Sequence, residues 1–362
     1  MFRNRIIFLS TLIAMLFSQH QGNSQSLETV LKDDGVIWSF VVLPEGHILY
    51  TLRSGRLKIY DPIGKKSTIV TGTPRVWAQG QGGLFDVALG HDFAKSGRIY
   101  LSYAKDLGNL RTTAVGRAIL KDFKLLDWQE IFIALPGTDE SIHFGGKLLV
   151  EKDGIFLTVG ERGVRDLAQK LDNHMGKILH LTLDGKAHPT NPYYSSKQSR
   201  PEIFTLGHRN PQGIARHPQT GELWAHEHGP RGGDEINRIV TGKNYGWPVI
   251  TYGREYHGPP IGEGISKKGM EQPVYHYVPS IAPSGFVIYK GKRYSSWNQS
   301  FVLGSLVLTH LNLVRIKDRS PVVESRLFEN QGLRIRDVRQ SSDDWLYFST
   351  DSGEIFKILP KN

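Results

Sequence analysis

The 362-residue chain contains no cysteine. Disulfide bonds and thiolate metal sites are therefore excluded, and a stable fold must come from a large hydrophobic core. Helical periodicity is almost absent, and beyond the N-terminal segment no apolar run reaches the roughly 20 residues that span a bilayer. The formal net charge is +10, but no run of five or more basic residues occurs, so nucleic-acid binding is not indicated.

The N-terminal segment has the pattern of an export signal. Arg3 and Arg5 precede an apolar run at residues 6–17, and small polar residues that suit a cleavage site follow it. The run is shorter than a membrane span. We predict a signal peptide at residues 1–24 and a periplasmic or secreted domain at residues 25–362, with an uncleaved membrane anchor as the alternative.

Short apolar runs bounded by Gly, Asp, Asn and Ser recur along the rest of the chain and predict an all-β fold. Six of them share a strand signature and are separated by roughly 45 to 80 residues, the spacing of four-stranded blades with loop insertions. We therefore predict a six-bladed β-propeller of four-stranded antiparallel blades in a single domain. The six runs are ILY at 48–50, IYL at 99–101, IFL at 155–157, LWA at 223–225, FVL at 301–303 and LYF at 346–348.

Two further patterns refine this architecture. Similar hairpins with a Ser-Gly turn occur at residues 51–60 and 350–358, which predicts that the terminal strands share a closing blade. Residues 253–272, rich in Gly, Pro and Lys, predict a long surface loop of the kind that often carries a site. A β-sandwich or two smaller barrels is the alternative, although no Pro- or Ser-rich linker divides the chain.

Polar residues that are costly to bury gather in four segments at predicted strand ends. In the first, Gln81 lies among glycines that let the backbone approach a ligand, although an ordinary glycine turn has the same pattern. In the second, His143 precedes Gly145 and Gly146, and Glu161 follows the next strand. A carboxylate beside a histidine orients the ring and raises its basicity, so His143 is a candidate general base, with a surface or core histidine as the alternative.

The third cluster consists of residues 207–213 (GHRNPQG) and 226–237 (HEHGPRGGDEIN). His226, Glu227 and His228 suggest a zinc or iron site. Strand alternation, however, points the two histidines to one face and Glu227 to the other. Backbone carbonyl groups at the Gly229-Pro230 turn suit calcium instead.

The fourth cluster is residues 333–339 (LRIRDVR). Two of its arginines are two residues apart, which is the spacing of side chains on one face of a strand. Arg334 and Arg336 should share a face, and their planar guanidinium groups match carboxylates bidentately. Arg339 should not share that face. A solvated edge strand is the alternative interpretation.

Taken together, these motifs resemble the soluble, quinone-dependent glucose and aldose sugar dehydrogenases. Those proteins are exported six-bladed propellers that carry pyrroloquinoline quinone (PQQ) and calcium. The resemblance extends from Trp38 to Pro360 and is most specific in GHRNPQG, in HGP at 228–230 with DEIN at 234–237, and in PSIAPS at 279–284. It implies oxidation of the C1 hydroxyl of a small aldose to a lactone, an external electron acceptor, and no membrane span once the signal is cleaved.

The resemblance also implies roles for the residues of the first three clusters. His143 matches the base that takes the proton from the C1 hydroxyl, and Glu161 matches its acidic partner. Gln81 matches a glutamine that lines the site. Arg209 and Asn210 match residues that hold the quinone and its reacting carbonyl group.

Further matches concern the metal and the carboxylates of the cofactor. The carbonyl oxygens of Gly229 and Pro230 would ligate calcium, which acts as a Lewis acid on the quinone. Arg334 and Arg336 would pair with cofactor carboxylates. One departure is Val307, which replaces a lysine that contacts the cofactor in the family.

A second departure affects the substrate. Ile142 stands where the best-known glucose enzymes have an acidic residue, so we expect a broad range of aldoses. Two alternative functions remain open: a propeller that has lost the cofactor and binds carbohydrate, and a calcium-dependent lactone hydrolase. Asp234, Glu235 and Tyr245 match a structural calcium site of relatives, although a hydrogen-bonded turn is the preferred interpretation of this segment.

Overall fold

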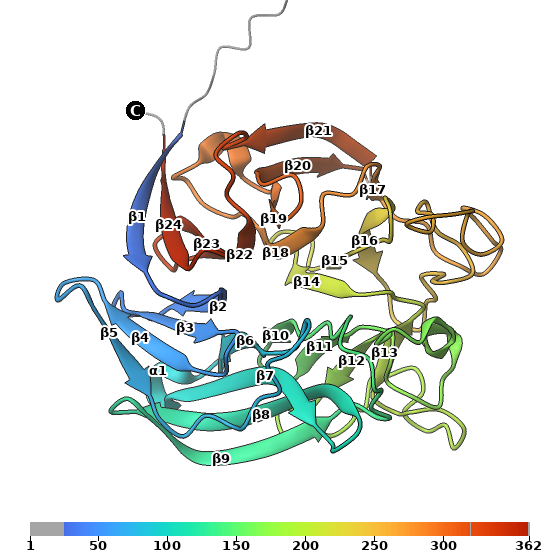
Figure 1. Cartoon of the computed structure of the whole chain (residues 1–362), viewed down its shortest axis with the longest axis horizontal. Helices are drawn as coiled ribbons and strands as arrows, with labels where there is room; N and C mark the ends of the chain where they lie inside the picture. The colour runs from blue at the N-terminus through green and yellow to red at the C-terminus, as the bar shows by residue number, and fades with distance from the viewer. Residues whose placement is uncertain (1–24, 319, 361–362) are drawn as a thin grey trace, which may run out of the picture.

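The computed structural model describes residues 25–318 and 320–360, and the predicted signal peptide lies outside these ranges. Within them, the strands form six four-stranded sheets, and every neighbouring pair of strands is antiparallel. Figure 1, viewed down the shortest axis of the molecule, shows the sheets arranged radially around a centre. The prediction of a six-bladed β-propeller is confirmed, and the sandwich and two-barrel alternatives are wrong.

The first three blades follow one another along the chain, each with its innermost strand first. Blade 1 contains β2 (Ile37–Val42), β3 (Ile48–Leu52), β4 (Leu57–Asp61) and β5 (Lys66–Val70). Blade 2 contains β6 (Leu84–Leu89), β7 (Arg98–Asp106), β8 (Arg111–Lys121) and β9 (Lys124–Ile133). Blade 3 contains β10 (Leu148–Val150), β11 (Ile155–Val159), β12 (Lys177–Leu181) and β13 (Ile203–Leu206).

The next two blades repeat this order, and the last one differs at its outer edge. Blade 4 contains β14 (Pro211–Arg216), β15 (Leu223–Glu227), β16 (Asp234–Ile239) and β17 (Tyr275–Tyr277). Blade 5 contains β18 (Pro283–Ile288), β19 (Phe301–Ser305), β20 (Leu311–Lys317) and β21 (Ser320–Leu327). Blade 6 contains β22 (Ile335–Gln340), β23 (Leu346–Thr350), β24 (Glu354–Leu359) and β1 (Ser26–Lys32). The helical segments are α1 (Phe93–Ser96), η1 (Arg165–Gln169) and η2 (Ser295–Trp297).

The ring is closed by the two ends of the described chain. Strand β1 pairs antiparallel with β24, with Leu27 opposite Ile358, and the blue and red strands lie side by side in Figure 1. Leu31 of β1 and Ile355 of β24 pack with Ile37 of blade 1. The predicted closing blade is therefore confirmed, and closure removes the open edges that a linear array of sheets would expose.

The six sequence signatures are the second strands of the six blades. These strands are buried on both faces, as in β3, where every residue is buried, because each sheet packs against a blade on either side. Large hydrophobic clusters accordingly lie between adjacent blades. One joins Leu49 of blade 1 to Leu101 of blade 2, and each buried leucine of this kind contributes about 1.5–3 kcal/mol.

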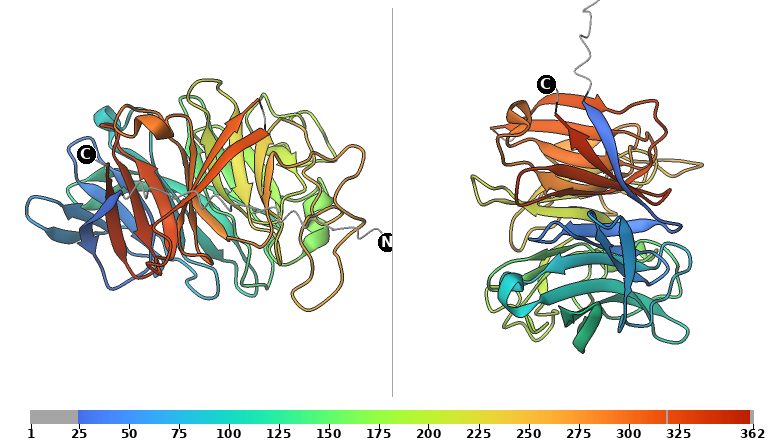
Figure 2. Two further views of the ribbon diagram at one scale, coloured as in Figure 1. Left: turned by 90° about the horizontal axis from the view of Figure 1, so that it is seen from above. Right: turned by 90° about the vertical axis from the view of Figure 1, so that its left-hand side faces the viewer.

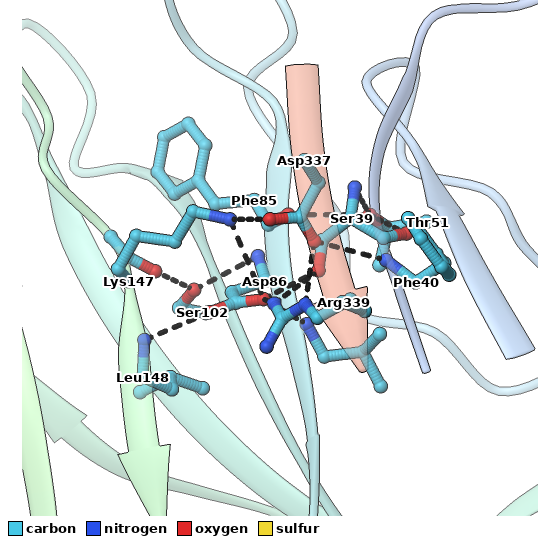
Figure 3. Close-up of polar contacts among 12 residues, drawn as sticks. Ser39, Phe40, Thr51, Phe85, Asp86, Ser102, Lys147, Leu148, Asp337 and Arg339 are labelled. Atoms are coloured by element: carbon cyan, nitrogen blue, oxygen red, sulfur yellow. Dashed lines mark hydrogen bonds and ion pairs between the residues drawn. The ribbon is translucent and has the colours of Figure 1, made fainter. Parts of the chain in front are cut away.

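The innermost strands β2, β6, β10, β14, β18 and β22 contact one another in turn around the axis. Figure 3 shows a polar cluster between them, which we call the central network and define as Ser39, Asp86, Lys147, Asp337 and Arg339. The first four of these residues are buried, and Arg339 is partly buried. Nζ of Lys147 donates to Asp337 at 2.8 Å, and Nε of Arg339 donates to the other oxygen of Asp337 at 2.7 Å. Arg339 also donates to Asp86 and, at 2.8 Å, to the Ser39 hydroxyl. Two acids and two bases from three blade regions thus neutralise one another.

Loops extend from both ends of the strands, and the side views in Figure 2 show a body flattened along the axis. The connection between β16 and β17 includes residues 253–272 and is drawn in gold at the right of Figure 1. Many of these residues are exposed, which confirms the predicted surface loop. No helix in the described ranges is long and apolar enough to cross a membrane.

Candidate active site

Two adjoining cavities, of about 700 and 340 Å³, open where the innermost strands begin, and we call them together the mouth. They share Gln81, His228, Ala282 and Val307 in their linings. Most of the candidate residues line one or both cavities, although they come from distant parts of the chain. These residues are Gln81, His143, Arg209, Asn210, Gly229, Pro230, Arg334 and Arg336.

The remaining candidate, Glu161, lies behind His143. Its Oε1 is 2.7 Å from Nδ1 of the histidine, and both side chains are largely buried. With an ionised carboxylate at this distance, Nδ1 carries the proton and donates it to Glu161. Nε2 is then the acceptor, and it belongs to a side chain that lines the larger cavity.

The backbone around His143 is held in an uncommon conformation. His143 has a φ of 54°, and its N–H donates to Oε1 of Gln81 at 2.8 Å. The segment that follows β11 and leads to Glu161 passes so close that a Cβ on Gly160 would lie 2.0 Å from the carbonyl oxygen of His143. Only glycine permits this approach, which brings the carboxylate against the ring.

Burial lowers the pKa of His143, and the nearby positive charge of Arg209 lowers it further. The hydrogen bond to Glu161 acts in the opposite direction and raises the pKa. The net shift is downward, so the ring is neutral at neutral pH. A neutral imidazole with an open Nε2 is the form that a general base requires.

Arg162, which no sequence motif singled out, is fully buried beside Glu161. Its guanidinium stacks on Phe144 at 3.3 Å from the ring centroid, and one nitrogen donates to the carbonyl oxygen of Glu140 at 2.6 Å. Nε and Nη1 of Arg162 have no hydrogen-bond partner, and burial lowers the pKa of this side chain to about 9. Its charge also contributes to the lowered pKa of His143.

Arg209 is positioned by Glu227 and by the Gly229 turn. Its backbone N–H donates to Oε2 of Glu227 at 2.6 Å, while Oε1 of the same carboxylate bonds Nδ1 of His208 at 2.8 Å. The guanidinium donates to the carbonyl oxygens of Gly229 at 2.9 Å and His228 at 3.2 Å. Nε of Arg209 is buried without a partner, so this side chain retains donor capacity beside the cavity.

Asn210 forms part of the floor of the smaller cavity. Its Oδ1 accepts from the backbone N–H of Gly145 at 3.1 Å and from Nε2 of Gln212 at 3.0 Å. Because the oxygen is used in these bonds, the amide nitrogen is the group left for a ligand. That nitrogen is a donor, which suits a carbonyl or carboxylate oxygen.

The histidines of the third cluster do not form a transition-metal site. Nε2 of His228 donates to the carbonyl oxygen of Pro283 at 2.7 Å, whereas His226 is buried against Phe286. Both thus face blade 5, while Glu227 turns the other way to His208, as strand alternation predicted. Burial lowers the pKa of each of these two histidines to about 3. The described residues contain no group of three or more His, Asp or Glu that suits a metal ion.

Arg334 and Arg336 share one carboxylate, Asp351. Arg336 pairs with it bidentately at 2.7 and 2.9 Å, and Nε of Arg334 donates to it at 3.1 Å. Arg336 also stacks over Trp38, 4.6 Å from the ring centroid. Arg339 points instead to the central network, so the predicted difference in facing is confirmed. The solvated-edge interpretation is wrong, because β22 is an innermost strand.

Asp351 was read in the sequence only as part of a turn. It follows β23 directly, and that strand ends at the mouth, which is the signal that could have identified it. Burial raises the pKa of its carboxyl group, but the hydrogen bonds and charges of Arg336 and Arg334 outweigh burial and lower it. Asp351 is therefore ionised and neutralises part of the charge on the two arginines.

The acidic turn after Pro230 is held by hydrogen bonds. Oδ1 of Asp234 accepts from the backbone N–H of Gly229 at 2.9 Å. Oδ2 accepts from Ser280 at 2.6 Å and from two further backbone N–H groups at 2.8 and 2.9 Å. This is the hydrogen-bonded turn that the sequence favoured. Glu235 differs, because burial and the charge of Glu227 raise its pKa to about 8.

Comparison with known proteins places the chain in a family. The family model for glucose / sorbosone dehydrogenase matches residues 35–357. Aldose sugar dehydrogenase YliI of Escherichia coli is 41% identical over 335 residues, which cover 90% of each chain.

Solved structures agree with this match. The crystal structure of the soluble aldose sugar dehydrogenase of E. coli in its apo form is 39% identical, covers 93% of this chain and 100% of its own, and superposes with a TM-score of 0.90. The PQQ-bound aldose sugar dehydrogenase of Streptomyces coelicolor shares the fold, with 24% identity over 93% of this chain and 99% of its own, at a TM-score of 0.78. The chain therefore belongs to the glucose/sorbosone dehydrogenase family, a family of sugar dehydrogenases built on the six-bladed propeller.

Proposed function

We propose that the protein oxidises the C1 hydroxyl of aldose sugars to lactones, with PQQ and calcium held in the mouth and His143 as the general base. The observation that carries this proposal is the convergence of His143, Arg209 and Arg336 on adjoining cavities. The family and the E. coli relative support a sugar as substrate. The PQQ-bound structure from Streptomyces coelicolor also favours a quinone as cofactor.

The chemistry of the lining fits a flat trianion. Arg209, Arg334, Arg336 and the amide of Asn210 present hydrogen-bond donors, and guanidinium groups pair bidentately with carboxylates. The orphaned Nε of Arg209 is a donor that gains a partner when an anion binds. The residues present therefore suit the carboxylates of PQQ.

Calcium fits the turn through backbone oxygens. The carbonyl groups of Gly229 and Pro230 belong to residues that line the larger cavity, and oxygen ligands are those that calcium prefers. Gly229 accepts a hydrogen bond from Arg209, and its carbonyl oxygen has a second lone pair that could ligate a cation.

When bound, the quinone supplies a hydride acceptor and calcium a Lewis acid that stabilises the charge formed on it. The chain itself supplies the proton transfer. Nε2 of His143 accepts the proton of the C1 hydroxyl as the C1 hydride leaves, and Glu161 stabilises the imidazolium that results. Burial of the ring lowers its pKa and so favours the neutral form of the base.

The test is reconstitution with PQQ and calcium, followed by dye reduction with a panel of aldoses. We expect turnover of several aldoses, since Ile142 replaces the acidic residue associated with narrower preference. Bound cofactor with no dye reduction by any aldose would overturn the proposal. Export through the predicted signal peptide, and an external electron acceptor, are parts of the same proposal.

A second candidate is a propeller that binds carbohydrate without the quinone. Two observations favour it: Val307 supplies no charge to the mouth, and Asp351 already occupies both neighbouring guanidinium groups. Calorimetric titration with PQQ in the presence of calcium separates the candidates. Heat of binding at one site per chain supports the dehydrogenase, and carbohydrate binding without quinone binding supports the second candidate.

A further inference from the structure

The lining of the larger cavity is cationic and lacks carboxylates. Three arginines line it, Arg209, Arg231 and Arg254, and none of its lining residues is Asp or Glu. The proposed cofactor accounts for Arg209 together with Arg334 and Arg336 of the smaller cavity. Arg231 and Arg254 remain without a role in that function.

These two arginines are placed directly opposite each other. The backbone N–H of each donates to the carbonyl oxygen of the other, at 3.2 and 3.4 Å, which makes an isolated antiparallel bridge. Residues that exchange both hydrogen bonds in this way project their side chains from the same face. Like charges directly opposite repel each other, and a bound anion would offset this repulsion.

Nearby acidic side chains are engaged elsewhere. Glu255 follows Arg254 in the chain, but both of its oxygens pair with Arg165, at 2.9 Å for the Nη2 contact. The carboxylate of Asp234 is filled by hydrogen bonds to Gly229 and to the segment that begins at Ser280. The positive charge at this rim is therefore not balanced by these neighbouring acids.

The bridge is also rigidly supported. A Cβ on Gly233 would lie 2.4 Å from the backbone nitrogen of Gly253, and a Cβ on Gly253 would lie 2.5 Å from the carbonyl oxygen of Gly232. This close packing fixes the loop of Arg254 against the loop of Arg231. The ion pair between Glu255 and Arg165 ties the same loop to η1.

We propose that Arg231 and Arg254 form a subsite for an anionic group on the sugar, so that the preferred substrates are aldoses carrying a carboxylate or a phosphate away from C1. This inference rests on the proposed function. A guanidinium pair recognises either anion, and His143 lines the same cavity, where it meets the C1 end. The exposed side chains at the rim leave the anion free to enter from solvent.

The test compares matched pairs of sugars on the protein reconstituted with PQQ and calcium: galacturonate with galactose, and glucose 6-phosphate with glucose. We expect kcat/KM to be about tenfold higher for at least one acidic member, since two partly exposed ion pairs each contribute a few-fold. The preference should decline at high salt, because the arginines are exposed. A preference for galacturonate over galactose identifies the anion as a carboxylate, and a preference for glucose 6-phosphate over glucose identifies it as a phosphate.

The decisive variant is Arg231→Gln/Arg254→Gln. Its ratio of acidic to neutral kcat/KM should fall to about one, through a higher KM for the acidic sugar. The control is Arg98→Gln, since Arg98 begins β7 at the opposite end of the strands and should leave the ratio at its wild-type value. Equal kcat/KM for acidic and neutral sugars in the wild type, or a preference that survives in the double variant, would overturn the inference.

Two further outcomes distinguish a subsite for the sugar from a site for the electron acceptor. If the double variant raises only the KM for an anionic dye such as ferricyanide, the arginines serve the electron acceptor, and the inference is wrong. If no sugar is oxidised, calorimetric titration with galacturonate and with glucose 6-phosphate still tests whether the anion binds. Binding that the double variant loses, without oxidation of any sugar, supports the anion subsite and overturns the proposed function.

Discussion

The central network and the mouth use the same charged residue types in opposite ways. In the central network, Lys147 and Arg339 face Asp86 and Asp337, and the two pairs of charges cancel. The linings of the mouth contain six arginines and a single carboxylate, Asp351. The six are Arg53, Arg209, Arg231, Arg254, Arg334 and Arg336.

The difference distinguishes a structural cluster from a binding site. Burial of a charge is costly unless it is paired and hydrogen-bonded, and the central network meets that condition. Burial raises the pKa of Asp337, but the charges of Arg339 and Lys147 outweigh burial and lower it. The excess of cations at the mouth has no such internal partner and suits an anionic ligand.

The largest expected effect concerns the base at the mouth. His143→Ala should lower kcat by about a hundred- to ten-thousand-fold, because a positioned general base contributes that much. PQQ binding should persist, since the arginines proposed to hold it are retained. Steady-state dye reduction and calorimetric titration on the same sample measure both properties, and unchanged turnover would refute the role of His143.

The next effect concerns the central network. Lys147→Met leaves two buried carboxylates with one guanidinium and should lower the free energy of unfolding by about 3–5 kcal/mol. Arg254→Met, which removes one member of a like-charged pair at the mouth, should change it by less than about 0.5 kcal/mol. Urea unfolding measures both, and equal losses would contradict the contrast between the two regions.

The acid limb of the pH profile of kcat/KM should shift in opposite directions in two variants. The proposed mechanism requires neutral His143, whose pKa is lowered below its usual 6.5, so the acid limb should lie below that pH. Glu161→Gln removes a bond that raises this pKa, so the limb should move to lower pH. Arg162→Met removes a charge that lowers it, so the limb should move to higher pH, by less than about one unit. Shifts in the same direction would contradict these assignments.

The smallest effect concerns Val307, whose side chain is 58% exposed in the lining of both cavities. Val307→Lys adds a cation beside the proposed carboxylates and should tighten PQQ binding by up to about fivefold, or about 1 kcal/mol. Val307→Gln is the uncharged control and should leave affinity near that of the wild type. Identical affinities for the two variants would show that charge at this position is unimportant.

Much of the fold could be predicted from the sequence because strand signatures are local. The run at 48–50 and its five counterparts mark second strands that are buried on both faces, and the repeated hairpin identified the closing blade. The contacts of Lys147 with Asp86 and Asp337 could not be predicted from such local patterns. These three residues are isolated polar positions in different blades, and only the closed ring brings them together.

The candidate site was predicted as far as its motifs are contiguous. His143, Arg209 and Gly229 lie in distinctive strings, and the structure brings these strings to one mouth. Arg162 was missed because a buried guanidinium stacked on Phe144 leaves no pattern along the chain. Asp351 was missed because its turn was assigned a purely structural role.

The most direct test is an anaerobic titration of the calcium-loaded protein with PQQ, followed by an aldose, with the absorbance of the bound quinone as readout. We predict that one quinone binds per chain and is reduced by the sugar, and that His143→Ala binds it but leaves it oxidised over the same time. Failure of the wild type to bind the quinone, or equally fast reduction in the variant, would contradict the assignment of the mouth as a quinone site with a histidine base.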